Sequence, residues 1–174
     1  QPSKLLGLND YVEMEGLGLR VSPTKVRNRS QLPSIYGYGD IDADKTYNNI
    51  MTKWKWGNFD KKKLFVDRSY MAEVQAMKLV ILRAALEFDR RGNKTKAAEM
   101  ANKYFEAFPH MNFAYDAGIM PFINVLVNAK DFESAKKHLR ILGEETKQYI
   151  TFYESQTDKD VFDSFERDYQ YRLS

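Results

Sequence analysis

The spacing of apolar residues along this chain changes near residue 60. From Tyr70 onward they recur every three or four positions, which is typical of amphipathic helices. We predict five helices there, over residues 70–91, 95–108, 114–129, 131–153 and 158–171. The first is apolar on nearly every side, because Leu79, Val80 and Leu82 widen its apolar face. Such a helix is expected at the centre of a fold, covered by its neighbours.

The first 60 residues follow a different pattern. Leu17, Leu19 and Val21 alternate with more polar or smaller residues, which predicts a short strand. A helix is predicted over residues 46–56, with Gly57 in the left-handed conformation just beyond its end. We therefore expect residues 1–60 to form an irregular N-terminal layer with one short helix, and residues 61–174 to form a helical domain. The layer is expected to pack on the helices through the strand's apolar residues and one tryptophan.

Two segments of the helical part resemble each other at a spacing of 38 residues. Residues 92–97 match residues 130–135, so that Ala97 corresponds to Ala135. Each segment is a predicted turn between two helices, with a small residue early in the second helix. Tetratricopeptide repeats have a similar layout with a period of about 34 residues. The predicted fold is therefore mainly α, with tetratricopeptide-like antiparallel helical hairpins, an irregular N-terminal layer and a short strand.

Composition and charge narrow the possible functions. The 27 basic and 24 acidic residues leave a net charge of +3, too small for the electrostatic footprint of a nucleic-acid-binding protein. The chain contains no cysteine, which excludes disulfides and thiol chemistry. No apolar run approaches the roughly 18 residues of a membrane-spanning helix. Because the chain begins at Gln1 without an initiator methionine, we interpret it as a piece of a longer protein.

No motif in the sequence predicts catalysis, a cofactor or a metal. His110 and His138 have no partners at a ligand spacing, and both are predicted to be solvated. The alternating carboxylates from Asp40 to Asp44 resemble the opening of a calcium loop. Lys45 and Met51 occupy the positions where that loop needs glycine and glutamate. We favour the interpretation that these carboxylates complement the dipole of the following helix.

The aromatic residues are the candidates for an interaction surface. Trp54 and Trp56 are two positions apart, so on a helix they would point in nearly opposite directions and only one could be buried. The other could contact a membrane-embedded region, a partner, a sugar or the chain's own N-terminal layer. The predicted surface consists of Tyr36, Tyr38, Trp54, Trp56 and Tyr115.

Several segments, in order, resemble a family of bacterial multi-spanning membrane proteins. Residues 11–23 read Tyr-Val-Glu-Met-Glu-Gly-Leu-Gly-Leu-Arg-Val-Ser-Pro, residues 53–57 read Lys-Trp-Lys-Trp-Gly, and residues 64–67 read Leu-Phe-Val-Asp. Residues 92–98, Phe108-Pro109, Tyr115-Asp116 and Met120-Pro121 follow. Together they are similar to the C-terminal part of glycosyltransferase family 117, relatives of protein O-mannosyltransferases. In that family the first segment has an aromatic residue where this chain has Gly18 and Leu19.

The resemblance implies a non-catalytic domain on the periplasmic side of the inner membrane. The family's catalytic carboxylates belong to its membrane-embedded part, and nothing in this chain corresponds to them. The expected partners are that membrane-embedded part, acceptor proteins or glycans, but not nucleic acid. An alternative hypothesis is a free-standing helical glycan-binding protein of the cell envelope. An independent hydrolase has less support, because no nucleophile motif is present.

Overall fold

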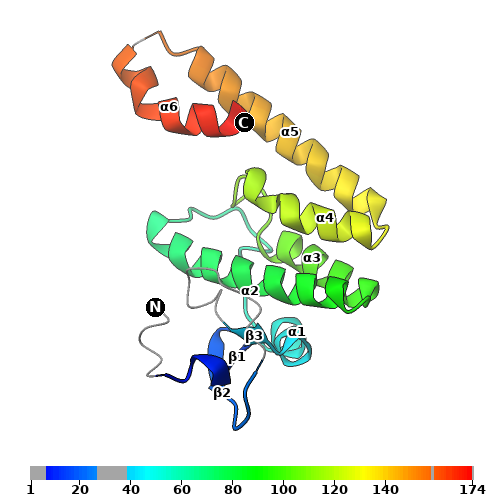
Figure 1. The fold of residues 1–174 in the computed structure, drawn as a ribbon. Coiled ribbons are helices and arrows are strands. Elements are labelled where there is room, and N and C mark those ends of the chain that lie inside the picture. Colours follow the sequence, from blue (N-terminus) through cyan, green and yellow to red (C-terminus); the bar gives the residue numbers. More distant parts are fainter. Residues whose placement is uncertain (1–6, 27–38, 158, 174) are drawn as a thin grey trace.

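The chain is mainly helical with one small three-stranded sheet (Figure 1). The computed structural model describes residues 7–26, 39–157 and 159–173. Figure 1 shows the sheet with the first helix beside it at one end, a stack of helices in the middle and the last helices of the chain at the other end. The strands are β1 (Val12–Glu15), β2 (Gly18–Val21) and β3 (Asp40–Ile41), and the α-helices are α1 (Ala43–Thr52), α2 (Met71–Arg90), α3 (Lys94–Ala107), α4 (Met120–Asn128), α5 (Phe132–Glu154) and α6 (Lys159–Leu173).

The sheet packs on the helices through its central strand. β1 pairs with β2 in the antiparallel sense and with β3 in the parallel sense. Val12 and Met14 on β1, together with Ile41 on β3, are buried. The predicted strand is confirmed as β2, and Leu19 packs on the core as expected. The expected packing of Leu17 and Val21 is wrong, because they are 40% and 56% exposed. β2 is an edge strand, and the alternating residues that face the core belong to β1 beside it.

A buried arginine joins the sheet to the central helix. Arg83 of α2 donates from Nη2 to the carbonyl oxygen of Gly39, at 2.6 Å, and from Nη1 to the sulfur of Met14, at 3.4 Å. Gly39 has a φ of +72°, and a Cβ built on it would lie 2.8 Å from the carbonyl oxygen of Val12. Glycine is therefore required where the chain enters β3, both for the backbone conformation and for the space.

Helix α1 is placed by its acidic N-terminus. The side chain of Asp42 accepts from the backbone N–H of Lys45, which caps the helix. Asp44 pairs with Lys96 at 2.7 Å and with Arg91 at 3.1 Å, which ties α1 to α3 and to the end of α2. The interpretation of these carboxylates as helix-terminal charges is supported by the Asp42 cap. The predicted helix end at residue 56 is wrong, since α1 ends at Thr52.

Helices α2, α3 and α4 enclose most of the core. α2 packs against α1, α3 and α4, as predicted for a helix that is apolar on nearly every side. Asp67 caps the short turn of 3-10 helix that leads into α2. Pro121 lies in the first turn of α4, where its missing N–H costs no hydrogen bond. The predicted start at residue 114 is wrong, because α4 begins at Met120 after a 3-10 turn that Asp116 caps.

The two turns at a spacing of 38 residues have the same backbone hydrogen bonds. Asn93 N donates to Phe88 O, and Asp131 N donates to Leu126 O, both at 2.9 Å. The side chains of Asn93 and Asp131 cap α3 and α5 in the same way. Gly92 and Lys130 precede these caps with φ angles of +79° and +63°. The sequence similarity therefore corresponds to a shared turn geometry.

The last two helices extend away from the sheet. The N-terminal part of α5 packs on α4, and α6 packs on α5 (Figure 1). The rings of Tyr153 and Phe165 stack at 5.3 Å between the two helices. The guanidinium of Arg172 lies 3.6 Å from the ring centre of Tyr149 and pairs with Asp168 at 2.8 Å. An aromatic cluster with a cation at its edge therefore holds α6 on α5.

Candidate interaction surface

The two tryptophans lie side by side beyond the end of α1. Both are half-buried, and their ring centres are 5.7 Å apart. Trp54 lies against the turn at Gly16, and Trp56 meets the ring of Phe108 edge-on at 5.7 Å. The predicted helix ends before both residues, so its opposite faces do not separate them. Trp56 packs on the core, and Trp54 contacts the N-terminal layer, which is one of the contacts expected for the second ring. Tyr36 and Tyr38 lie outside the described residues.

Tyr115, the fifth predicted residue, is in the core. It is 2% exposed, so it offers no surface to a partner. Its hydroxyl lies 3.1 Å from Nδ1 of His138, whose ring stacks on Phe105 at 3.6 Å. His138 is only 6% exposed, which makes the prediction of a solvated histidine wrong. The α5 face that carries His138 turns toward the core, whereas the charged residues beside it in the sequence turn away.

Burial determines the protonation of this pair. It lowers the pKa of His138 to about 4, and the positive charge of Lys137 acts in the same direction. The imidazole is therefore neutral near pH 7. Burial also raises the pKa of Tyr115, so that its hydroxyl keeps its proton. A neutral tyrosine and a neutral histidine can share one hydrogen bond, which suits a structural contact and not a nucleophile with its base.

Glu145 ties α5 to the segment that connects α3 and α4. One of its carboxylate oxygens accepts from the backbone N–H of Tyr115, and the other lies 3.0 Å from Nδ1 of His110. Asn112, in the same segment, bonds to the backbone of residues 59, 62 and 64. The connecting segment is therefore fixed on both sides and forms one wall of a hollow along α5.

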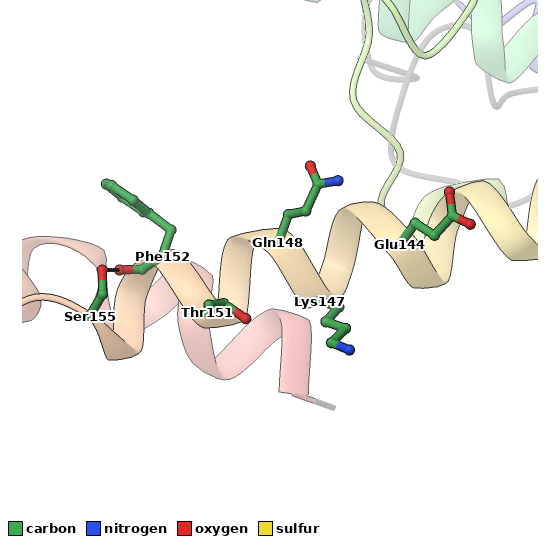
Figure 2. A pocket seen from close by; sticks show the side chains of 6 residues that line it. All are labelled: Glu144, Lys147, Gln148, Thr151, Phe152 and Ser155. Atoms are coloured by element: carbon green, nitrogen blue, oxygen red, sulfur yellow. Dashed lines mark hydrogen bonds between the residues drawn. The ribbon is translucent and has the colours of Figure 1, made fainter.

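The hollow runs along the exposed side of α5. We call it the α5 surface, and it is lined by Ala114, Glu145, Gln148, Tyr149 and Phe152, with a volume of about 300 Å³. A second hollow of about 500 Å³ adjoins it and shares Gln148 and Phe152 with it; its other lining residues are Glu144, Lys147, Thr151 and Ser155. Figure 2 shows Glu144, Gln148 and Phe152 leaving one side of α5, while Lys147 points the other way. The four-residue spacing places the first three in one row along the helix.

The α5 surface combines an exposed ring with polar groups. Phe152 is 50% exposed although the rings of Tyr153 and Phe165 lie 5.6 and 6.0 Å away from it. Gln148 and Glu144 are exposed beside it. Sequence reasoning missed this surface because Phe152 fits the helical aromatic pattern of residues 149–153. Residues three and four positions apart share one face of a helix, so local sequence carried no signal that Phe152 would stay exposed.

The described residues contain no group of histidine, cysteine or carboxylate side chains that could hold a metal ion. Among the helices of the same part of the chain, none is both long and apolar enough to cross a membrane. No known family model matches the chain, and no curated protein or solved structure is significantly similar to it.

Proposed function

We propose that this chain is a non-catalytic interaction domain of a membrane glycosyltransferase-like protein. It belongs to the periplasmic side of the membrane and uses the α5 surface to contact the membrane-embedded part of the same protein or an acceptor protein. The observation that carries the proposal is the half-exposed Phe152 in a hollow with amide and carboxylate groups around it. A large ring among polar groups is typical of protein interfaces.

The repeat supports the helical-hairpin interpretation of the fold. In this proposal α2 with α3 is one tetratricopeptide-like unit and α4 with α5 is the next, joined by turns with the same hydrogen bonds. Such arrays need end units that cover the last apolar face. α6 serves as this cap for the C-terminal half of α5, through the aromatic cluster at Tyr153. The α5 surface is the side that α6 leaves open.

Crosslinking in the complete membrane protein tests the proposed contact. A photo-reactive amino acid is placed at Gln148, on the α5 surface, and in a matched protein at Lys136, an exposed residue of α5 that lines neither hollow. We expect the Gln148 protein to crosslink to the membrane-embedded part or to an acceptor, and the Lys136 protein to crosslink much less. Equal crosslinking from both positions would contradict the proposal.

Sugar transfer by the same protein gives an independent measurement. Phe152→Ser removes the exposed ring, and Phe132→Ser is the matched control, because it removes an exposed ring of α5 that lines neither hollow. We expect the first change to lower transfer to acceptor proteins and the second to leave it unchanged.

The isolated chain is expected to show no turnover. Release of sugar by the isolated chain, at a rate that one substitution abolishes, would overturn its non-catalytic role. Retention on immobilised glycans without any membrane partner would favour the alternative of a free-standing glycan-binding protein.

A further inference from the structure

A separate pocket lies between the first half of α2 and the segment that leads into α4. We call it the Lys78 pocket; its volume is about 240 Å³, and it is lined by charged, amide and aromatic side chains, among them Gln75, Lys78, Tyr104, Phe108, Phe113 and Asp116. Pockets for drug-sized ligands measure roughly 300–1,000 Å³. The Lys78 pocket therefore suits a ligand of about one ring.

The amino group of Lys78 lacks a close acceptor within the described part of the chain. Its side chain is 14% exposed, and the nearest carboxylate oxygen, Oδ1 of Asp116, lies 3.9 Å away. That distance is too long for a hydrogen bond, and Oδ1 already accepts from the backbone N–H of Gly118 at 2.8 Å. The ring centre of Tyr104, 5.6 Å away, is the ammonium's other neighbour. An ammonium has three donors, and leaving them unmet in a mostly buried place costs stability.

Gly118 leaves the space into which both charged groups project. A Cβ built on it would lie 2.9 Å from Nζ of Lys78 and 2.8 Å from Oδ1 of Asp116. Any larger residue would therefore displace one of them. Burial lowers the pKa of Lys78, and Asp116 opposes this effect. An ammonium placed this way destabilises the folded chain unless a further acceptor reaches it.

We infer that the Lys78 pocket binds a neutral polyhydroxy ligand the size of one pyranose ring. One hydroxyl of the ligand accepts from Lys78 and donates to Asp116, since a single oxygen can lie within hydrogen-bond distance of two atoms 3.9 Å apart. The half-buried ring of Phe113 supplies an apolar wall for the C–H face of the sugar ring. Gln75 adds an amide that can bond further hydroxyls.

The charges in the pocket argue against an anion. A carboxylate or phosphate on Lys78 would come close to Asp116 and be repelled by it. A zwitterion such as an amino acid carries charges that complement both groups, so glycine is the competitor that decides between the two ligand classes. Sugar binding in this pocket needs neither the parent membrane protein nor a partner. The inference can therefore fail while the proposed function stands, and the proposed function can fail while the inference stands.

Nuclear magnetic resonance of the isotope-labelled 174-residue chain tests this inference. The probes are D-glucose, D-galactose and N-acetyl-D-glucosamine, with sodium acetate and glycine as the competing anion and zwitterion. We expect at least one sugar to shift the amide signals of residues 74–78 and 116–119 in a saturable way. Shifts from acetate or glycine alone, or no saturable shift from any sugar, would overturn the inference and leave the pocket as a site for water.

Matched variants assign the binding to the two charged groups. Lys78→Met keeps an unbranched side chain, one atom shorter, without the ammonium donors, and Asp116→Asn keeps the shape of the side chain without its charge. We expect the sugar-induced shifts to disappear in Lys78→Met. In Asp116→Asn the affinity for the sugar should fall at least tenfold. Lys147→Met, on the exposed side of α5, should leave both the shifts and the affinity unchanged. The spectrum without sugar shows whether each variant is folded. If Lys78→Met is unfolded, the test rests on Asp116→Asn alone. Unchanged sugar binding in either variant, once that variant is shown to be folded, contradicts the inference.

Discussion

At the scale of single residues, the turn before α5 stores backbone strain. Lys130 has a φ of +63°, a region that side chains with a Cβ rarely adopt, and the corresponding residue of the earlier turn is Gly92. Lys130→Gly should therefore stabilise the chain by about 0.5–1 kcal/mol, because glycine adopts a positive φ without the steric cost that a Cβ brings. Chemical denaturation measures the change. Gly92→Ala is the reciprocal control and should destabilise; a destabilised Lys130→Gly chain would contradict the assignment.

Gly39 also has a positive φ, and in addition it leaves no space for a Cβ. Gly39→Ala should destabilise the chain by about 2 kcal/mol or more, since the added Cβ would meet the carbonyl oxygen of Val12 at 2.8 Å and φ would remain positive. Gly7→Ala is a matched control, because Gly7 also has a positive φ but no atom within 4 Å of the added Cβ. Thermal unfolding compares the two. Equal losses would show that the close approach at Val12 contributes nothing.

His138 and Phe152, two of the residues that sequence reasoning misplaced, share one cause. His138 lies among Lys136, Lys137 and Arg140 in the sequence, which indicates a polar helix face. On the structure it is the one member of this group that turns inward, toward Phe105 and Tyr115. Single-residue burial depends on where a neighbouring helix lies, and local sequence carries no information about that position. The exposed Phe152 was missed for the same reason.

At the scale of elements, the small residues of the repeat lie where helices approach closely. Ala97 is fully buried on α3, near the beginning of the helix that packs on α2. Ala97→Leu should overpack this contact and lower the free energy of unfolding by about 1–3 kcal/mol. Ala72→Leu, at an exposed alanine of α2, is the control and should change stability by less than about 0.5 kcal/mol. An unchanged denaturation midpoint for Ala97→Leu would contradict the close contact.

Helix positions were largely predictable, because caps and breakers mark them. Asp67 before α2, Pro109 after α3 and Pro121 in the first turn of α4 act locally, through backbone donors that lie near them in the sequence. Strand β1 was missed although Val12 and Met14 alternate with Glu13 and Glu15, which is the period of a half-buried strand. Its pairing with β3 joins positions 13 and 40, and no local pattern specifies so distant a partner.

At the scale of the whole molecule, the buried histidine couples stability to pH. The pKa of His138 is about 4 in the folded chain and about 6.5 when unfolded, so below pH 6.5 the unfolded chain binds a proton that the folded chain refuses. Stability should therefore be full above pH 6.5 and should fall steadily as the pH drops toward 4. Glu87, whose pKa its arginine neighbours lower to about 2, loses its contribution only at more acidic pH, below about 4.5.

Denaturation curves measured from pH 7.5 to pH 4 check this expectation. His138→Gln, which cannot take up the proton, should show a weaker dependence on pH between 6.5 and 4 than the unchanged chain. The control is His110→Gln, at the exposed histidine beside Glu145, which should keep the dependence. If His138→Gln loses stability with the same slope as the unchanged chain, the buried imidazole is not the group that titrates.

The unequal lengths of α4 and α5 have a mechanical consequence. α4 has 9 residues and α5 has 23, so α5 extends about 20 Å farther along its axis than its neighbour. Gly143 lies near the middle of α5, and a Cβ built there would meet nothing within 4 Å. Glycine lowers the local preference for helix at this point. A bend of about 10° at Gly143 would move the end of α5 by about 3 Å. If α5 bends at this glycine, the overhang would convert a small rotation into a change in the width of the hollow that contains Phe152.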